Sequence, residues 1–306
     1  MNARFYQLDV FADRPFEGNQ LAVFENGDDV PEAMMPVLAR EMNFPESVFL
    51  LSDMRPGSDA RARIFTPEQE LPMAGHPTVG TTFLLAALER IKAPSPLLIL
   101  DLKIGPTFVD LVWNENGTLH FAWMNQRAPE FGNPLRDDLR AGLASALSLD
   151  PSSLLPLPLQ TVSSGVPFLF VPVVSEAAVD SAAVDRKALN AVLEEAGEDA
   201  PRPVFVFAMS PRPNITFYSR MFAPEFGIPE DPATGGASGP LGCYAFRHGL
   251  VDRAQAGDMV SLQGAKMKRP SRIAVSLLTR EDGEVLTVRV GGQAIIVGAG
   301  EMFCPD

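Results

Sequence analysis

The sequence predicts an α/β fold of the α+β type, built from two similar halves that each wrap a mostly antiparallel sheet around one central helix. Each half has a run of short strands, then a turn containing Pro or Gly, and then an unusually apolar helix; the two turns are Gly75–Thr78 and Asp231–Gly236. A helix that is apolar on nearly every side is expected inside a domain, with sheet around it. At 306 residues the chain is also long enough for two ordinary domains.

In the first half, alternating and β-branched segments predict strands. These strands are expected at 5–11, 21–24, 47–51 and 60–66, and as several short strands across 97–124. A helix is expected to begin with Pro31 in its first turn and to run through Met42, where Asn43-Phe44-Pro45 stops it. Pro77 and Thr78 open the first apolar helix.

The second half is expected to contain helices at 135–147 and 186–196, and strands within 163–173 and at 203–208, 214–222, 275–278, 285–290 and 294–297. The second apolar helix follows the Gly-rich turn and ends at Gly249. Between the halves, the Pro-rich stretch 128–134 is interpreted as a passage, which puts the boundary within 118–130. We therefore expect domains of 1–124 and 125–306, with the last strand a candidate for crossing back to the first domain.

The charge balance predicts what the protein does not bind. Lys and Arg number 25 against 38 Asp and Glu, which gives a net charge of −13. Such a field repels phosphate backbones and anionic membrane surfaces, so neither a nucleic acid nor a membrane is expected as a partner. A small anionic substrate would also be repelled at long range, so local donors such as backbone N–H groups must hold it.

Cysteine and histidine are sparse. Cys243 and Cys304 are the two cysteines, too few for a disulfide framework or a Cys-rich zinc site, and we expect two ordinary reduced thiols. The three histidines are scattered, so no metal site is predicted. The opening segment lacks the apolar stretch of a signal peptide, and no run is long enough for a spanning helix. The expected location is therefore the cytoplasm.

Three ionisable residues next to turns are candidates for chemistry. His76 stands at a helix start, whose positive end favours a neutral ring that can donate to a carboxylate or share a proton; packing is the alternative. Glu46 is flanked by Phe44 and Phe49, and partial desolvation there would raise its pKa toward the range of a general acid/base; a solvated loop glutamate is the alternative. Asp231 borders the second Gly-rich turn, where an N-cap role is the alternative.

The two helix N-termini offer unpaired N–H groups and positive dipole ends to an anion. If the halves face each other, both N-termini converge on one cleft, although many helices begin with Gly and Pro for structural reasons alone. Nucleotide binding lacks its usual motifs, because no GxGxxG opens a strand-to-helix turn and no Walker Lys follows the glycines. The run GGASGP has Pro240 where a nucleophile elbow needs its final Gly.

Five segments occur in the order typical of one family: DVFADRPFEGNQLAV, EMNFPESVFL, RIFTPEQELPMAGHPTVG, SSGVPFLFVPV and RMFAPEFGIPEDPATGGA. The chain resembles the phenazine-biosynthesis PhzF-like proteins. This resemblance implies the diaminopimelate-epimerase-like fold, with two pseudo-symmetric domains and the active site in the cleft between them. It implies that Glu46 is the acid/base, that Gly75 and His76 form the substrate-binding turn, and that Asp231 assists at the reacting group. It also implies a homodimer that needs no cofactor.

One position departs from the family pattern. After Thr234-Gly235 the family commonly has a serine, and this chain has Gly236. Ser238 is a candidate replacement two residues further on, at a different helix phase. The resemblance therefore supports the reaction class more than the family's best-known substrate, dihydro-hydroxyanthranilate. Racemases with this fold use two facing thiols, which is disfavoured here because Ala74 precedes Gly75.

The expected function is a cofactor-independent isomerase. Glu46 moves a proton from one carbon of a small carboxylic acid to another, while His76 and Asp231 hold the substrate and share protons. The N–H groups at Gly75 and at Gly235–Gly236 bind the carboxylate. Two alternatives stay open: racemase- or epimerase-type proton transfer on an amino-acid-like substrate, and a non-catalytic metabolite-binding protein.

Overall fold

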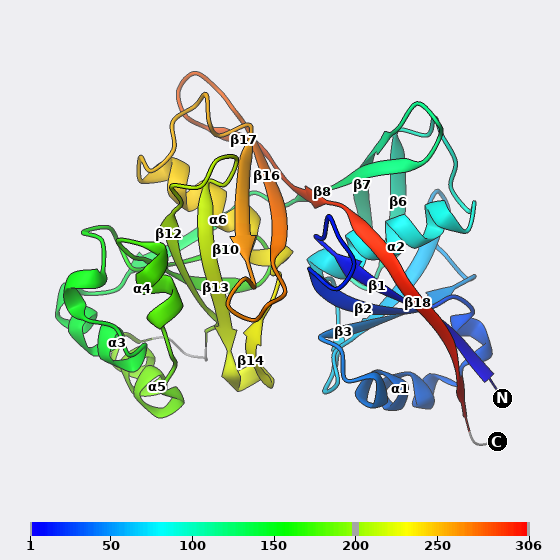
Figure 1. Cartoon of the computed structure of the whole chain (residues 1–306), viewed down its shortest axis with the longest axis horizontal. Coiled ribbons are helices and arrows are strands. Elements are labelled where there is room, and N and C mark those ends of the chain that lie inside the picture. Colours follow the sequence, from blue (N-terminus) through cyan, green and yellow to red (C-terminus); the bar gives the residue numbers. More distant parts are fainter. Residues whose placement is uncertain (1, 198–201, 305–306) are drawn as a thin grey trace. The chain divides into compact units, whose positions relative to one another are not determined.

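The computed structural model describes residues 2–197 and 202–304 (Figure 1). The chain divides into two compact units, the first made of residues 1–125 and 289–306 and the second of residues 126–288. Strand β17 (Val285–Gly292) contains the boundary at which the chain returns to the first unit. There β18 (Ala294–Phe303) pairs antiparallel with β1 (Asn2–Val10), so both chain ends belong to the first unit (Figure 1).

The first unit is a mostly antiparallel sheet. Its further strands are β2 (Asn19–Phe24), β3 (Glu46–Leu51), β4 (Ala60–Phe65), β5 (Glu70–Leu71), β6 (Leu97–Leu102), β7 (Gly105–Trp113) and β8 (Leu119–Gln126). The pairing order is β18, β1, β2, β3, β4, β6, β7, β8, in which only β2–β3 and β4–β6 are parallel among these described pairs. The short β5 adds to β4.

The second unit repeats this arrangement. Its strands are β9 (Glu130–Pro134), β10 (Gln160–Ser163), β11 (Pro167–Pro172), β12 (Val204–Met209), β13 (Phe217–Ala223), β14 (Ile228–Asp231), β15 (Met259–Gln263) and β16 (Ser271–Thr279). The pairing order is β9, β10, β11, β12, β13, β15, β16, and the parallel pairs β11–β12 and β13–β15 stand where β2–β3 and β4–β6 stand in the first unit. The short β14 adds to β13 as β5 adds to β4.

Each sheet packs on one central helix that follows the short strand. In the first unit α2 (Gly75–Ala87) contacts β1, β2, β3 and β18, and in the second unit α6 (Gly235–Arg247) contacts β10, β11 and β16. Both helices are buried over most of their length, as their apolar composition predicts. The predicted fold class, two halves with a sheet around a central helix, is confirmed.

Further helices cover the opposite side of each sheet. In the first unit α1 (Met35–Met42) packs with aromatic side chains of the strands, among which Phe24 and Phe49 stack at 4.5 Å between ring centroids. In the second unit α3 (Arg140–Ala146), α4 (Glu176–Ser181) and α5 (Arg186–Glu195) lie outside the strands, in a core separate from that of α6 (Figure 1). The strands under these helices are therefore buried on both faces, whereas β7 and β16 keep exposed positions such as Phe108 and Leu278.

Several element boundaries differ from the predicted ones. The helix expected from Pro31 begins at Met35, because a 3-10 turn, Glu32–Met34, precedes it and Pro36 then stands in the first turn. The helix expected at 135–147 likewise starts with a 3-10 turn, Asp137–Leu139. Part of the stretch interpreted as a passage, 128–134, is the strand β9, which pairs with β10. Helix α4 was not predicted, and it begins with a Ser175 side-chain cap on the Ala178 N–H.

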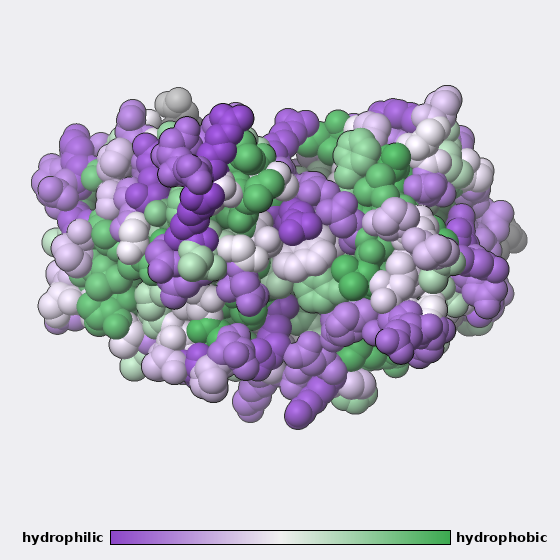
Figure 2. Space-filling model, turned by 90° about the horizontal axis from the view of Figure 1, so that it is seen from above, coloured by the Kyte–Doolittle hydropathy of each residue, from purple (hydrophilic) through white to green (hydrophobic). Residues whose placement is uncertain are grey.

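The surface mixes hydrophilic residues with small apolar areas, as the face in Figure 2 shows. Exposed large apolar residues include Phe16, Val174, Leu278 and Phe303, which come from different parts of the sequence. Within the described ranges, no helix is both long enough and apolar enough to cross a membrane.

Candidate active site

The first unit brings Glu46 and His76 into direct contact. Glu46 is the first residue of β3 and His76 the second residue of α2. The Nδ1 atom of His76 lies 3.1 Å from Oε2 of Glu46, with the side chains 4% and 13% exposed. Glu46 is therefore a partly buried strand residue and not a solvated loop glutamate, and His76 is its buried neighbour.

Burial decides the charge of His76. Removal from water lowers the pKa of the His76 ring to about 3, and a backbone hydrogen bond with Gln20 opposes only part of this effect. The imidazole is consequently neutral at pH 7. A neutral ring next to a carboxyl group can donate one proton in a hydrogen bond without forming a permanent ion pair.

Asn19 is a third member of this cluster, and the sequence analysis missed it. It opens β2, is fully buried, and places its Nδ2 3.3 Å from the same Nδ1 of His76. Strands β2 and β3 are parallel with Leu21 opposite Glu46, which brings the starts of both strands together. The sequence signal that could have pointed to Asn19 is the Gly18-Asn19 pair directly before a predicted strand. An amide side chain that is buried there needs a hydrogen-bond partner.

Gly18 fixes the turn that delivers Asn19. Its φ is +69°, and a Cβ at this position would lie 2.3 Å from the carbonyl oxygen of Val10 and 2.8 Å from Cβ of Ala12. An L side chain is thus excluded both by backbone conformation and by space. The turn before β2 depends on glycine here.

Nδ1 of His76 has two close polar neighbours. When it is bare, it accepts from the Asn19 amide at 3.3 Å. Oε2 of Glu46 approaches the same atom to 3.1 Å without the geometry of a hydrogen bond. The three side chains therefore form one polar cluster at the starts of β2, β3 and α2.

The N-terminus of α2 lies directly beside this pair. Its N-cap residue, Ala74, provides no side-chain hydrogen bond, and the first turn holds no acidic residue. Thr78 instead donates its hydroxyl to the Ala74 carbonyl at 2.8 Å, inside the helix. The N–H groups at Gly75 and His76 thus have the chemistry of an anion-binding helix start.

In the second unit, Asp231 belongs to a hydrogen-bonded turn ahead of α6. The hydroxyl of Thr234 donates to Oδ2 of Asp231 at 2.5 Å, and Nε2 of Gln263 donates to the Asp231 carbonyl at 2.7 Å. Gln263 also accepts from the Thr234 N–H at 3.1 Å. The N-cap residue of α6 is Thr234, so Asp231 does not take the N-cap position. The turn holds Asp231 in a fixed geometry near Gly235 and Gly236.

Gly236 and Ser238, the two positions considered for a substrate-binding hydroxyl, differ in their surroundings. A Cβ added to Gly236 would meet only Phe168, at 3.9 Å, so a side chain has room at this position. Ser238 is fully buried, and its hydroxyl donates to the Thr234 carbonyl at 2.9 Å. That hydroxyl proton is used inside α6, so Ser238 cannot donate it to a substrate at the same time.

The central helix of the second unit gives no support for catalysis by a thiol. Cys243 lies in the middle of α6 and is 1% exposed. Burial raises the pKa of its thiol to about 12, so it stays protonated near neutral pH. Among the residues that the structure describes, no group of three or more His, Cys, Asp or Glu is arranged to hold a metal ion.

Two repeated sheet-and-helix units define the fold as epimerase-like. A hydroxyproline epimerase from Agrobacterium vitis has this fold, with a TM-score of 0.62 at 11% identity over 98% of this chain and 92% of that one. The family model of the phenazine biosynthesis-like proteins, PhzC-PhzF, matches residues 8–300. The chain belongs to this family.

Two relatives are similar over nearly their whole length. A trans-2,3-dihydro-3-hydroxyanthranilate isomerase of Pseudomonas fluorescens is 36% identical over 293 residues, which are 96% of each chain. The crystal structure of a PhzF-family phenazine biosynthesis protein of Bacillus anthracis has a TM-score of 0.88 at 26% identity, over 99% of this chain and 100% of that one. These comparisons confirm the predicted family resemblance.

Proposed function

We propose that this protein is a cofactor-independent isomerase that shifts a proton between two carbons of a small carboxylic acid. The observation that carries the proposal is the buried contact between Glu46 Oε2 and Nδ1 of a neutral His76. The similarity to an isomerase of Pseudomonas fluorescens supports the same reaction class.

In the proposed reaction the Glu46 carboxylate takes a proton from one substrate carbon. The electron pair of the broken C–H bond moves into the adjacent unsaturated system, and the double bond shifts. The Glu46 carboxylic acid then returns its proton to the second carbon, so the enzyme ends in its starting state. His76 packs its Nδ1 against Glu46 and so limits the positions of that carboxyl group, and the Asn19 amide donates to Nδ1 when this nitrogen is bare.

The remaining candidates are proposed to bind and assist. Each helix start, at Gly75 in the first unit and at Gly235–Gly236 in the second, offers N–H groups to a substrate carboxylate, in keeping with the lack of side-chain caps at both. Asp231, held by Thr234, would share protons at the reacting group. The homodimer and the cytoplasmic location remain predictions from the sequence.

The substrate class is a small unsaturated or hydroxylated carboxylic acid. The isomerase of Pseudomonas fluorescens is named for trans-2,3-dihydro-3-hydroxyanthranilate. Gly236 removes a hydroxyl that the family commonly has, so we propose the chemistry of that compound class without assigning the compound itself.

The test is incubation of the purified protein in D₂O with trans-2,3-dihydro-3-hydroxyanthranilate and a panel of cyclic and acyclic unsaturated carboxylates. Mass spectrometry and NMR then locate any carbon-bound deuterium. We expect deuterium at the carbon that is protonated in the product of at least one substrate. Saturable binding without deuterium uptake across the panel would contradict the proposal and favour the metabolite-binding alternative.

A further inference from the structure

The second unit contains a cavity of about 630 Å³ that the proposed reaction does not use. It lies at the end of α6 opposite the Asp231 turn, since Cys243, Phe246 and Arg247 line it and Gly235 begins the helix. Along α6, Cys243 stands eight positions after Gly235, a rise of roughly 12 Å, and Arg247 twelve positions after it, roughly 18 Å. The cavity is therefore distinct from the candidate catalytic groups of this unit.

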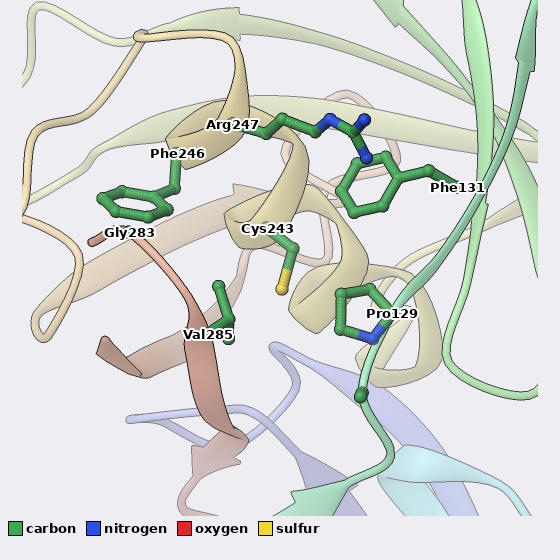
Figure 3. A pocket seen from close by; sticks show the side chains of 8 residues that line it. Pro129, Phe131, Cys243, Phe246, Arg247, Gly283 and Val285 are labelled. Atoms are coloured by element: carbon green, nitrogen blue, oxygen red, sulfur yellow. The ribbon is translucent and has the colours of Figure 1, made fainter. Parts of the chain in front are cut away.

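The walls of the cavity are largely apolar. They come from three segments: the chain leading into β9, the last turns of α6, and the turn and start of β17 (Figure 3). Phe131, Phe246 and Val285 surround the space, and Pro129 closes one side of it (Figure 3). Cys243 points into it as a neutral thiol, because its pKa is raised to about 12. The volume falls in the usual range of small-molecule sites.

One cation faces these walls. The guanidinium of Arg247 lies over the Phe131 ring, with Cζ 4.3 Å from the ring centroid (Figure 3). In the part of the chain that the structure describes, Arg247 makes no ion pair, although 38 acidic residues outnumber the basic ones. Stacking on an aromatic face holds the planar guanidinium group in place and leaves the N–H groups along its edge available to a carboxylate.

We propose that this cavity binds a small monocarboxylate with an aromatic or branched apolar body, distinct from the substrate of the proposed isomerase. The carboxylate pairs with Arg247, and the apolar body lies among Phe131, Phe246 and Val285. Arg247 is an exposed residue, and its guanidinium gives the apolar cavity one positive group with which a carboxylate can pair. A neutral apolar compound would gain no such charged contact.

The probe for the test is 3-phenylpropionate, with 3-phenylpropanamide as its uncharged match. Each is titrated into the full-length protein labelled in its valine methyl groups, and two-dimensional NMR follows Val285, assigned through Val285→Ala. We expect a saturable shift of Val285 with the acid and a markedly weaker response with the amide. Equal affinity for acid and amide would overturn the proposal.

Two variants decide the role of the guanidinium. Arg247→Gln should raise the Kd for 3-phenylpropionate by about fivefold or more. Arg253→Gln removes the same charge from an exposed residue of the same unit and should leave the affinity unchanged. Equal affinity in the wild type and in Arg247→Gln, with unchanged melting temperatures, would contradict the proposal.

The catalytic groups are a competing site for any carboxylate. Val79, buried in α2 near His76, reports on that site. A saturable shift at Val79 without one at Val285 would assign the probe to the catalytic groups and overturn the present inference, while leaving the proposed isomerase intact. The two proposals therefore fail separately.

Discussion

At the scale of single residues, the candidate site is built around a neutral histidine that lies against a carboxyl group. The pKa of His76 is about 3 in the folded protein, against an ordinary value of 6.5. Between these two pH values the unfolded chain binds a proton at His76 that the folded protein does not bind. The free energy of unfolding therefore falls as the pH drops from 6.5 toward 3, and the contribution is fully present above 6.5.

We accordingly expect His76→Gln to lose less stability on acidification than the wild type. Urea unfolding at pH 7.5 and at pH 5 measures the difference for each protein. The glutamine variant removes the titrating ring and keeps a polar group of similar reach. Equal losses in the two proteins would show that His76 titrates normally in the folded state.

A second residue-scale prediction concerns Gly236. A side chain at this position has room, with Phe168 at 3.9 Å from an added Cβ. Gly236→Ser should therefore fold with nearly unchanged stability and restore the hydroxyl common in the family. We expect a higher kcat/KM for trans-2,3-dihydro-3-hydroxyanthranilate, measured in parallel with the wild type on the same preparation of substrate. A lower value together with intact folding would show that the glycine is required.

Sequence motifs and the family resemblance made Glu46, Gly75, His76 and Asp231 candidates, because each stands at a turn whose Gly, Pro and Phe neighbours are visible locally, and their roles stay predictions. Asn19 was not predicted, because it becomes buried only when β2 packs against β3 and α2. These contacts join residues that are far apart in the chain. The engagement of Ser238 inside α6 was likewise invisible before the helix was known.

At the scale of elements, the turn before β2 positions Asn19 through Gly18. Gly18→Ala should lower the free energy of unfolding by more than about 2 kcal/mol, the sum of left-handed strain and a clash with the Val10 carbonyl. Gly57→Ala is the matched control, with φ +85° and no atom within 4 Å of its added Cβ, and should cost only about 1 kcal/mol. Equal costs, measured by denaturant titration, would contradict the role of the clash.

Element types followed from the sequence more readily than their bounds. The two central helices were predicted because their apolar composition is independent of their surroundings. Helix starts shifted where 3-10 turns precede α1 and α3, since proline and cap residues suit both helix types. Strand β9 was missed because Gly132 and Pro134 reduce strand propensity, and its pairing with β10 compensates.

At the scale of the whole molecule, the net charge of −13 acts against the substrate that the site is proposed to bind. At low ionic strength this repulsion reaches about 30 Å, and at 0.15 M salt only about 8 Å. We therefore expect kcat/KM for a carboxylate substrate to rise as sodium chloride is added over this range. Steady-state kinetics at constant pH tests this, and a monotonic fall would show that local cations dominate the approach of the substrate.

The two units have the same strand-pairing pattern. This explains why the two halves of the sequence show the same order of short strands, a turn with Pro or Gly, and an apolar helix. In each unit a short added strand, β5 or β14, comes directly before the central helix, which begins at Gly75 or Gly235. The same chain geometry thus produces a helix start near a candidate ionisable residue in each unit. The order of pairing itself could not be predicted, because parallel neighbours depend on non-local contacts.

The central claim is that Glu46 carries the proton, and the most direct test compares Glu46→Gln with the wild type in a D₂O exchange assay on a turned-over carboxylate. Positioned acid–base groups contribute about 10²- to 10⁴-fold, so deuterium uptake should fall by at least about 10²-fold while circular dichroism and the melting temperature stay near wild type. Glu41→Gln, which changes an exposed glutamate at the end of α1, should retain full uptake. Near-normal uptake in Glu46→Gln would contradict the account.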